Sequence, residues 1–195
     1  MEAPYPSFQK IPRLRREVIV SEKIDGSNGL IHISDDLSVV RAGSRNRWIT
    51  PEKDNHGFAC FVKKHEDELR KLGPGHHYGE WYGAGIQRRY GLLEKKFALF
   101  NAGRWVAHPD GGVFEKHLPE NHIALTLVQV VPVLSVGKQD SAVEEALTLL
   151  REKGSVLVPG FMDPEGIVVY HTAARCLFKV TCRGDEQFKG QKEEG

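Results

Sequence analysis

The sequence predicts an α+β fold in which antiparallel sheets surround a pocket, and three observations support this. Short runs of β-branched and aromatic residues, separated by turn residues, recur along most of the chain. Only two segments carry apolar residues at helical spacing. No repeat or linker divides the 195 residues, a length that buries about 70% of the surface of an unfolded chain.

The strands are predicted from β-branched and aromatic segments that end at turn residues. In chain order they are Glu17–Glu22, Gly29–Ile33, Ser38–Ala42, Tyr78–Trp81, Phe97–Asn101, Leu125–Leu134, Gly166–Tyr170 and Cys176–Thr181. The tripeptide Asp110–Gly112 predicts a hairpin turn. This order of strands and turns suits antiparallel sheets.

The two helices are predicted at Gly57–Lys71 and Ala142–Lys153, where apolar residues follow the helical repeat. The first helix is expected to end before the Gly-Pro-Gly segment Gly73–Gly75, and the second before Gly154. The charged and polar residues 184–195 predict a tail outside the folded domain, which spans residues 1–183.

Composition narrows the class of protein. The net charge of +1 does not by itself indicate a nucleic-acid binder, so the distribution of arginines matters more. Arginines stand at 13, 15, 16, 41, 45, 47, 88 and 89, and they form a phosphate-binding rim if they converge on the pocket.

Three cysteines without metal-ligand spacing favour a reducing compartment. Since no apolar run is long enough to span a bilayer, we expect a cytoplasmic protein.

The most informative segment is Glu22–Gly29, with the sequence Glu-Lys-Ile-Asp-Gly-Ser-Asn-Gly. Side chains alternate along a strand, so Lys23 and Asp25 face the same pocket. Gly26 allows a tight turn or the close approach of a phosphate. A lysine amine is a nucleophile in its neutral form, and a buried strand end favours that form. Taken alone, the segment also fits a surface hairpin.

Four later segments provide partners for the lysine in a consistent order. They are Tyr78–Gly83, Phe97–Asn101, Glu165–Tyr170 and Leu177–Thr181. Glu165 begins an apolar strand and Lys179 lies inside one, and a buried charge is costly without a partner. The anion that pairs with Lys179 is Glu80, Glu165 or a ligand phosphate. Together these residues predict a nucleotide-transfer site.

These motifs resemble the covalent nucleotidyltransferase superfamily of polynucleotide ligases and capping enzymes. The run Glu22–Asn28 is most similar to RNA ligases of the second bacteriophage type and to kinetoplastid RNA-editing ligases. DNA ligases and capping enzymes more often carry arginine where Asn28 stands. The resemblance covers residues 18–183 and implies an ATP-grasp-like adenylation domain. Only fourteen residues follow Thr181, so we expect neither an OB-fold nor a helical C-terminal domain.

The resemblance implies a role for each motif residue. Lys23 is the catalytic residue that takes AMP from ATP, Asp25 and Glu165 hold Mg²⁺ or Mn²⁺, and Phe100 stacks on adenine. Glu80 binds the ribose hydroxyls. The residues implied at the nucleotide are Glu22, Lys23, Ile24, Asn28, Arg45, Glu80, Phe100, Glu165 and Lys179. Those implied at the nucleic acid are Asn28, Arg41, Arg45 and Arg47.

The implied activity is that of an ATP-dependent RNA ligase. Such an enzyme joins 5′-phosphate and 3′-hydroxyl RNA ends, which can belong to a nicked or splinted duplex. A nick ligase for DNA or mixed strands remains an alternative, followed by a GTP-using capping enzyme. The final motif reads Lys179-Val-Thr181 where most ligases have two lysines. This departure leaves open a degenerate nucleotide- or RNA-binding module, and Arg183 is a candidate substitute for the missing lysine.

Overall fold

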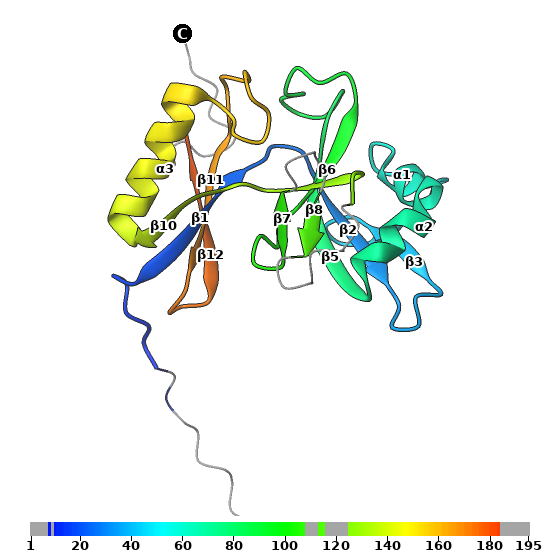
Figure 1. The fold of residues 1–195 in the computed structure, drawn as a ribbon, viewed down its shortest axis with the longest axis horizontal. Helices are drawn as coiled ribbons and strands as arrows, with labels where there is room; N and C mark the ends of the chain where they lie inside the picture. The colour runs from blue at the N-terminus through cyan, green and yellow to red at the C-terminus, as the bar shows by residue number, and fades with distance from the viewer. Residues whose placement is uncertain (1–7, 9, 108–112, 116–124, 184–195) are drawn as a thin grey trace, which may run out of the picture.

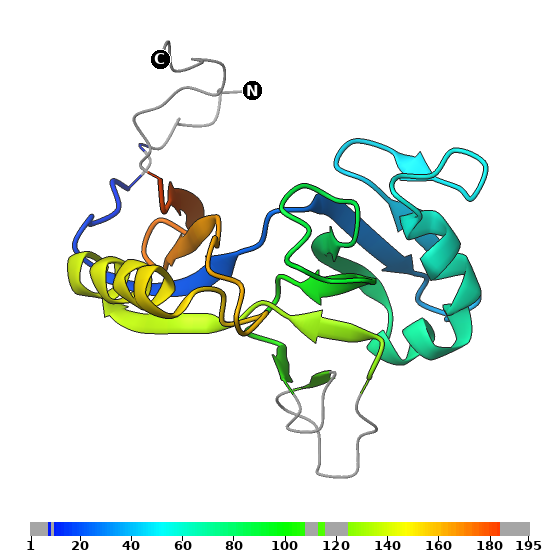
Figure 2. The same ribbon diagram turned by 90° about the horizontal axis from the view of Figure 1, so that it is seen from above.

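The computed structural model describes residues 8, 10–107, 113–115 and 125–183 (Figure 1). Two sheets lie side by side, with helix α3 at one flank of the molecule and helices α1 and α2 at the other (Figures 1 and 2). The chain leaves the first sheet after β1 and enters the second at β2, and it returns between β9 and β10. The mixed α+β class predicted from the sequence is confirmed.

The first sheet has four antiparallel strands. Their order across the sheet is β10 (Val133–Lys138), β1 (Glu17–Lys23), β11 (Gly166–His171) and β12 (Cys176–Thr181). Helix α3 (Gln139–Lys153) covers one face, where Ala146 and Leu150 join Val18 and Val20 in a buried cluster. Because side chains alternate along β1, Lys23 shares the opposite face with Ile19 and Ser21.

The second sheet has six strands. Their order is β4 (Trp48–Ile49), β3 (Val40–Gly43), β2 (Ser27–Ile33), β5 (Gly75–Gly83), β6 (Lys95–Leu99) and β9 (Val128–Val130). Neighbours pair antiparallel except β6 and β9, which are parallel. A larger core lies on one face, formed by side chains such as Ile31, Trp81 and Phe97 together with Phe58 and Leu69 from the helical segment.

The helical segment consists of three short pieces, where the sequence predicted one helix over Gly57–Lys71. They are α1 (Phe58–Lys64), α2 (Glu66–Leu69) and a 3₁₀ turn (Arg70–Leu72). His65, with φ −116° and ψ 22°, leaves the helical region between α1 and α2. The second predicted helix is confirmed and begins three residues earlier, at Gln139.

The predicted strand Leu125–Leu134 is wrong as a single element. It forms β9 and β10, which belong to different sheets, and Pro132 lies between them. Proline has no N–H for a strand ladder, so it marks the point where the chain changes sheets. The pattern also missed β4 and the pair formed by β7 (Trp105–Ala107) and β8 (Val113–Glu115). The predicted turn at 110–112 and tail at 184–195 lie outside the described residues.

No helix in the part of the chain that the structure describes combines the length and apolar character needed to cross a membrane.

Candidate active site

A polar cavity of about 630 Å³ opens where β1 passes into β2. Both sheets contribute to it, because the turn Ile24–Gly26 joins the end of one sheet to the start of the other. The lining residues are Lys23, Asp25, Gly26, Ser27, Asn28, Ser44, Arg45, Asn46, Arg47, Asn55, Glu80, Gln87 and Glu165. Lys23, Asp25, Asn28, Arg45, Arg47, Glu80 and Glu165 were all predicted as site residues from the sequence.

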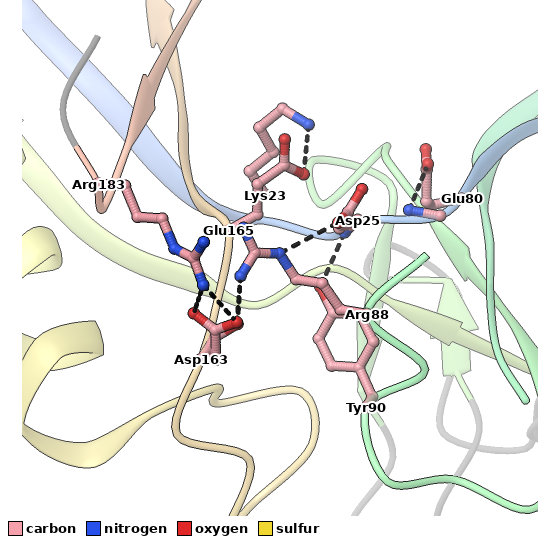
Figure 3. Close-up of polar contacts among 9 residues, drawn as sticks. Lys23, Asp25, Glu80, Arg88, Tyr90, Asp163, Glu165 and Arg183 are labelled. Carbon is pink, nitrogen blue, oxygen red and sulfur yellow. Dashed lines mark hydrogen bonds and ion pairs between the residues drawn. The ribbon is translucent and has the colours of Figure 1, made fainter. Parts of the chain in front are cut away.

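Lys23 and Glu165 form an ion pair at the edge of this cavity (Figure 3). The Nζ atom of Lys23 lies 2.6 Å from Oε2 of Glu165. The sheet register explains the contact, since Lys23 pairs with Gly166, the residue after Glu165. Gly166 has φ +153°, and a Cβ there would lie 2.1 Å from the carbonyl oxygen of Val180. Glycine at 166 is therefore required for the backbone that presents Glu165 to Lys23.

Asp25 belongs to a chain of alternating charges beside the lysine (Figure 3). Its Oδ2 atom accepts a hydrogen bond from Nε of Arg88 at 3.1 Å. Arg88 Nη1 lies 2.6 Å from Oδ2 of Asp163, and Arg183 Nη2 donates to the same carboxylate at 3.0 and 3.1 Å. The Asp25 backbone N–H donates to the hydroxyl of Tyr90 at 2.7 Å, which fixes the turn.

Glu80 approaches the same turn from the other sheet. Its Oε1 accepts the N–H of Gly26 at 3.0 Å and its Oε2 accepts from Nδ2 of Asn28 at 3.3 Å. This approach needs glycine, since a Cβ at Gly26 would lie 2.4 Å from the Trp81 carbonyl oxygen. The Glu80 residue is 8% exposed. Burial raises the pKa of Glu80 to about 7, against the attraction of Lys23.

The polar contacts continue from Asn28 to the rim of the cavity. Nε of Arg45 donates to Oδ1 of Asn28 at 3.0 Å, so one amide connects Glu80 with Arg45. Asn55, just before α1, donates to the hydroxyl of Ser27 at 2.6 Å. The cavity lining thus combines carboxylates with arginine and amide groups.

Three predicted nucleotide-binding residues lie away from the cavity lining on the first sheet or at its end. Glu22 is buried on the α3 side, where its Oε2 accepts the backbone N–H groups of Val156 and Leu157, both at 2.9 Å. Ile24 is buried in a small apolar cluster that includes Tyr82. Lys179 is exposed on β12.

The register shows which final-motif residue is nearest to the lysine. Thr181 pairs with Gly166, and Gly166 pairs with Lys23, so Thr181 lies level with Lys23 two strands away. Lys179 is two residues farther along β12, on the same face. The position level with Lys23 on β12 therefore carries a hydroxyl.

Phe100 and Arg41 also lie outside the cavity lining. Phe100 comes directly after β6. Ala98 pairs with Glu80 and shares its sheet face, and Phe100, two residues after Ala98, faces the same way because side chains alternate along a strand. Arg41 is exposed on β3, where its guanidinium lies 4.4 Å from the ring centre of Trp48. Their predicted roles stay predictions.

Sequence reasoning missed Asp163, Tyr90 and Asn55 as site residues. Asp163 and Tyr90 fix Arg88 and the Asp25 turn, as described above. Asp163 lies two residues before Glu165, the one local signal of its role. Tyr90 carries no such signal because it reaches Asp25 across 65 residues of sequence.

Asp25 and Glu165 suit a hard divalent cation by the chemistry of their oxygen atoms. Both carboxylates line the cavity, and each is engaged by a cation of the chain, Arg88 or Lys23. No cluster of three or more acidic, histidine or cysteine residues in the described ranges is arranged to hold a metal. The residues therefore fit an ion such as Mg²⁺ that keeps water and substrate phosphates among its ligands.

Comparison with known proteins identifies the family. A family model described as RNA ligase matches residues 16–181, and the chain therefore belongs to the RNA ligase family. No curated protein sequence matches it.

Solved structures of Naegleria gruberi RNA ligase variants share the fold. An apo variant has 20% identity and a TM-score of 0.54, over 88% of this chain and 51% of that one. A variant with AMP and Mn has 20% identity and a TM-score of 0.54, over 87% and 51%. A variant with ATP and Mn has 20% identity and a TM-score of 0.55, over 88% and 50%. The chain thus spans about half the length of these ligases.

Proposed function

We propose that the chain is an ATP-dependent RNA ligase that works through a covalent lysyl-AMP intermediate on Lys23. The observation that carries the proposal is the position of Lys23 Nζ, 2.6 Å from Glu165 in a cavity that Asp25 and Glu80 also line. Membership of the RNA ligase family supports RNA as the substrate. Related structures bound to ATP or AMP with Mn support ATP as the AMP donor and Mg²⁺ or Mn²⁺ as the metal.

In the first step, Lys23 attacks the α-phosphorus of ATP, and a P–N bond forms as the bond to pyrophosphate breaks. The amine must lose its ammonium proton first. The carboxylate of Glu165 is in position to take that proton, since its Oε2 already accepts the hydrogen bond from Nζ at 2.6 Å. The AMP then passes to a 5′-phosphate, and a 3′-hydroxyl displaces it to close the phosphodiester bond.

The surrounding residues bind and orient the nucleotide. The carboxylate of Glu80 accepts the ribose hydroxyls, and its pKa of about 7 makes this acceptor sensitive to pH near neutrality. Asp25 and Glu165 hold the divalent ion, which when bound offsets negative charge on the phosphates. From the rim of the cavity, Arg45 contacts the α-phosphate or the RNA. The adenylation domain that carries these residues spans residues 1–183.

The test is covalent labelling of the purified chain with α-³²P-labelled ATP and Mn²⁺ or Mg²⁺. We expect label that survives denaturation and is released by acid, as a phosphoramide is. Lys23→Arg should abolish it, because arginine is not deprotonated to a nucleophile in proteins. Lys63→Arg, on the exposed side of α1, is the matched control and should label normally. An unlabelled wild-type chain would contradict the proposal.

Thr181 favours a second candidate, a nucleotide- or RNA-binding module that has lost catalysis. The hydroxyl at this position, level with Lys23, leaves less positive charge for the phosphates than the usual lysine. A chain that binds ATP in equilibrium dialysis but takes no covalent label would support this second candidate.

A further inference from the structure

A row of aromatic side chains crosses the second sheet beyond the cavity. The row consists of Trp48, His32, His76 and Tyr78 and is called the aromatic row below. The His32 and His76 rings stack with centroids 4.6 Å apart, and the His76 and Tyr78 rings are nearly parallel at 6.1 Å. Trp48 lies 5.7 Å from His32. Tyr78 is 58% exposed and Trp48 is 42% exposed, so the row presents rings to solvent.

The strand pattern connects this row to the cavity. Along β5, alternate residues Glu80, Tyr78 and His76 share one face, while His77, Gly79 and Trp81 turn toward the core. Measured along the strand, Tyr78 therefore lies about 7 Å from Glu80 and His76 lies about 13 Å from it. Cross-strand pairing sets His32 beside His76. The row begins where the cavity wall ends.

Positive charge accompanies the rings. The Arg41 guanidinium lies 4.4 Å from the Trp48 ring centre, and Arg45 and Arg47 line the neighbouring cavity. Exposed rings on an open sheet beside arginines suit unpaired nucleotides, because bases stack on the rings and phosphates meet the guanidinium groups. The row carries two imidazoles, a phenol and an indole, and each of these planar rings can stack on a base.

We propose that the aromatic row binds a single-stranded stretch of RNA next to the end that is being joined. The proposal rests on the proposed ligase function for its choice of RNA, and it names how that substrate approaches the cavity. Stacking on Tyr78 and Trp48 supplies affinity with little base preference, since every base has a π face.

The binding test uses a fluorescent single-stranded RNA of mixed sequence in an anisotropy titration. Tyr78→Ala and Trp48→Ala should each weaken binding about fivefold or more, which is the effect of losing one stacked base. Tyr78→Phe keeps the ring and should bind like the wild type. Phe178→Ala is the matched control, because Phe178 is 54% exposed but lies on β12 in the other sheet.

Tryptophan fluorescence gives a second measurement that does not depend on a folding defect. Trp81 and Trp105 are buried, so Trp48 is the exposed tryptophan that a base can stack on. RNA should quench the emission of the wild type, and Trp48→Phe should remove that quenching. Unchanged quenching in Trp48→Phe would overturn the proposal.

The outcomes separate this proposal from the ligase function. Self-labelling with ATP should be normal in Trp48→Ala, since Trp48 lines neither the cavity nor the neighbouring pocket that Phe100 lines. If the chain is labelled by ATP but Tyr78→Ala and Trp48→Ala bind RNA like the wild type, the proposed role of the aromatic row is wrong and the ligase function stands. If these variants bind RNA more weakly but the wild-type chain takes no label, the ligase function alone is contradicted. The proposed role of the row is also wrong if blunt duplex RNA binds as tightly as single-stranded RNA, or if the substitutions change only the self-association of the chain.

Discussion

Arg88 forms an ion pair with Asp25, with Nε of the arginine 3.1 Å from Oδ2 of the aspartate. Asp163 holds the same guanidinium at 2.6 Å and also binds Arg183 (Figure 3). One of the two carboxylates proposed for the metal is thus kept in place by an arginine, and the other by Lys23. These ion pairs fix both carboxylates at the cavity that would receive the nucleotide and its cation.

The first prediction concerns this arginine. Arg88→Gln should slow self-labelling by about tenfold, because a hydrogen bond between charged groups contributes about 1.5–3 kcal/mol. Arg88→Lys should restore part of the rate. Arg89→Gln is the matched control, since Arg89 is exposed and lies outside the cavity lining. The rate is measured as labelled protein against time at saturating ATP, and an unchanged rate in Arg88→Gln would show that Asp25 needs no fixed partner.

The second prediction follows from the raised pKa of Glu80. Its folded-state pKa of about 7 exceeds its ordinary value of 4.5, so folding favours the neutral carboxyl. That stabilisation is full below pH 4.5 and is lost as the pH rises through 7, a loss of up to about 3 kcal/mol. Urea unfolding at pH 5 to 8 should therefore show that Glu80→Gln becomes more stable relative to the wild type as the pH rises. A constant difference would mean that Glu80 is ionised throughout this range.

The core of the site could be predicted because its signals are local. In β1, Val18 and Val20 alternate with residues of the opposite face, and the same alternation assigns Lys23 to the face away from α3. Glu165 begins an apolar strand, and a charge in such a position needs a partner. The pairing of β1 with β11 then brings the two residues together.

The remaining features depend on contacts that no local pattern records. The helical spacing of apolar residues continues past His65, and it indicates only which side of the segment faces the core. It does not show that the helix is interrupted at His65, where the backbone hydrogen bonds change. The Arg88–Asp163 pair joins positions 75 residues apart, and partly exposed charges have no distinctive sequence neighbours. Pro132 did carry a usable signal, because a proline inside a predicted strand argues against one continuous element.

The third prediction addresses the nucleotide base. If adenine stacks on Phe100, Phe100→Ala should raise the ATP concentration for half-maximal labelling about fivefold or more, and Phe100→Tyr should not. ATP should label the chain and GTP should not. Phe178→Ala serves again as a control for an exposed ring on the other sheet. An unaffected Phe100→Ala would mean that adenine stacks on a different residue, and equal labelling by GTP would favour a capping enzyme.

The last prediction separates the two kinds of binding that the site offers. Lys23 and Glu165 are partly buried and Glu80 is buried in the same cavity, so salt screens their interactions with a nucleotide only weakly. Arg45 and Arg47 lie at the exposed rim, where contacts with RNA phosphates exchange with counterions and weaken steeply as salt rises. Self-labelling should therefore change little between 50 and 200 mM salt, while joining of preadenylylated RNA should fall by about tenfold or more.

Arg45→Ala should reduce joining more than labelling and should flatten the salt dependence of joining, because one phosphate contact is lost. Arg151→Ala, on the exposed side of α3, removes the same charge far from the cavity and should change neither step. Both steps are measured on the same preparations, with labelled ATP for the first and preadenylylated RNA for the second. If RNA joining stays fast at high salt and is unchanged in Arg45→Ala, the RNA is held by groups other than the rim arginines.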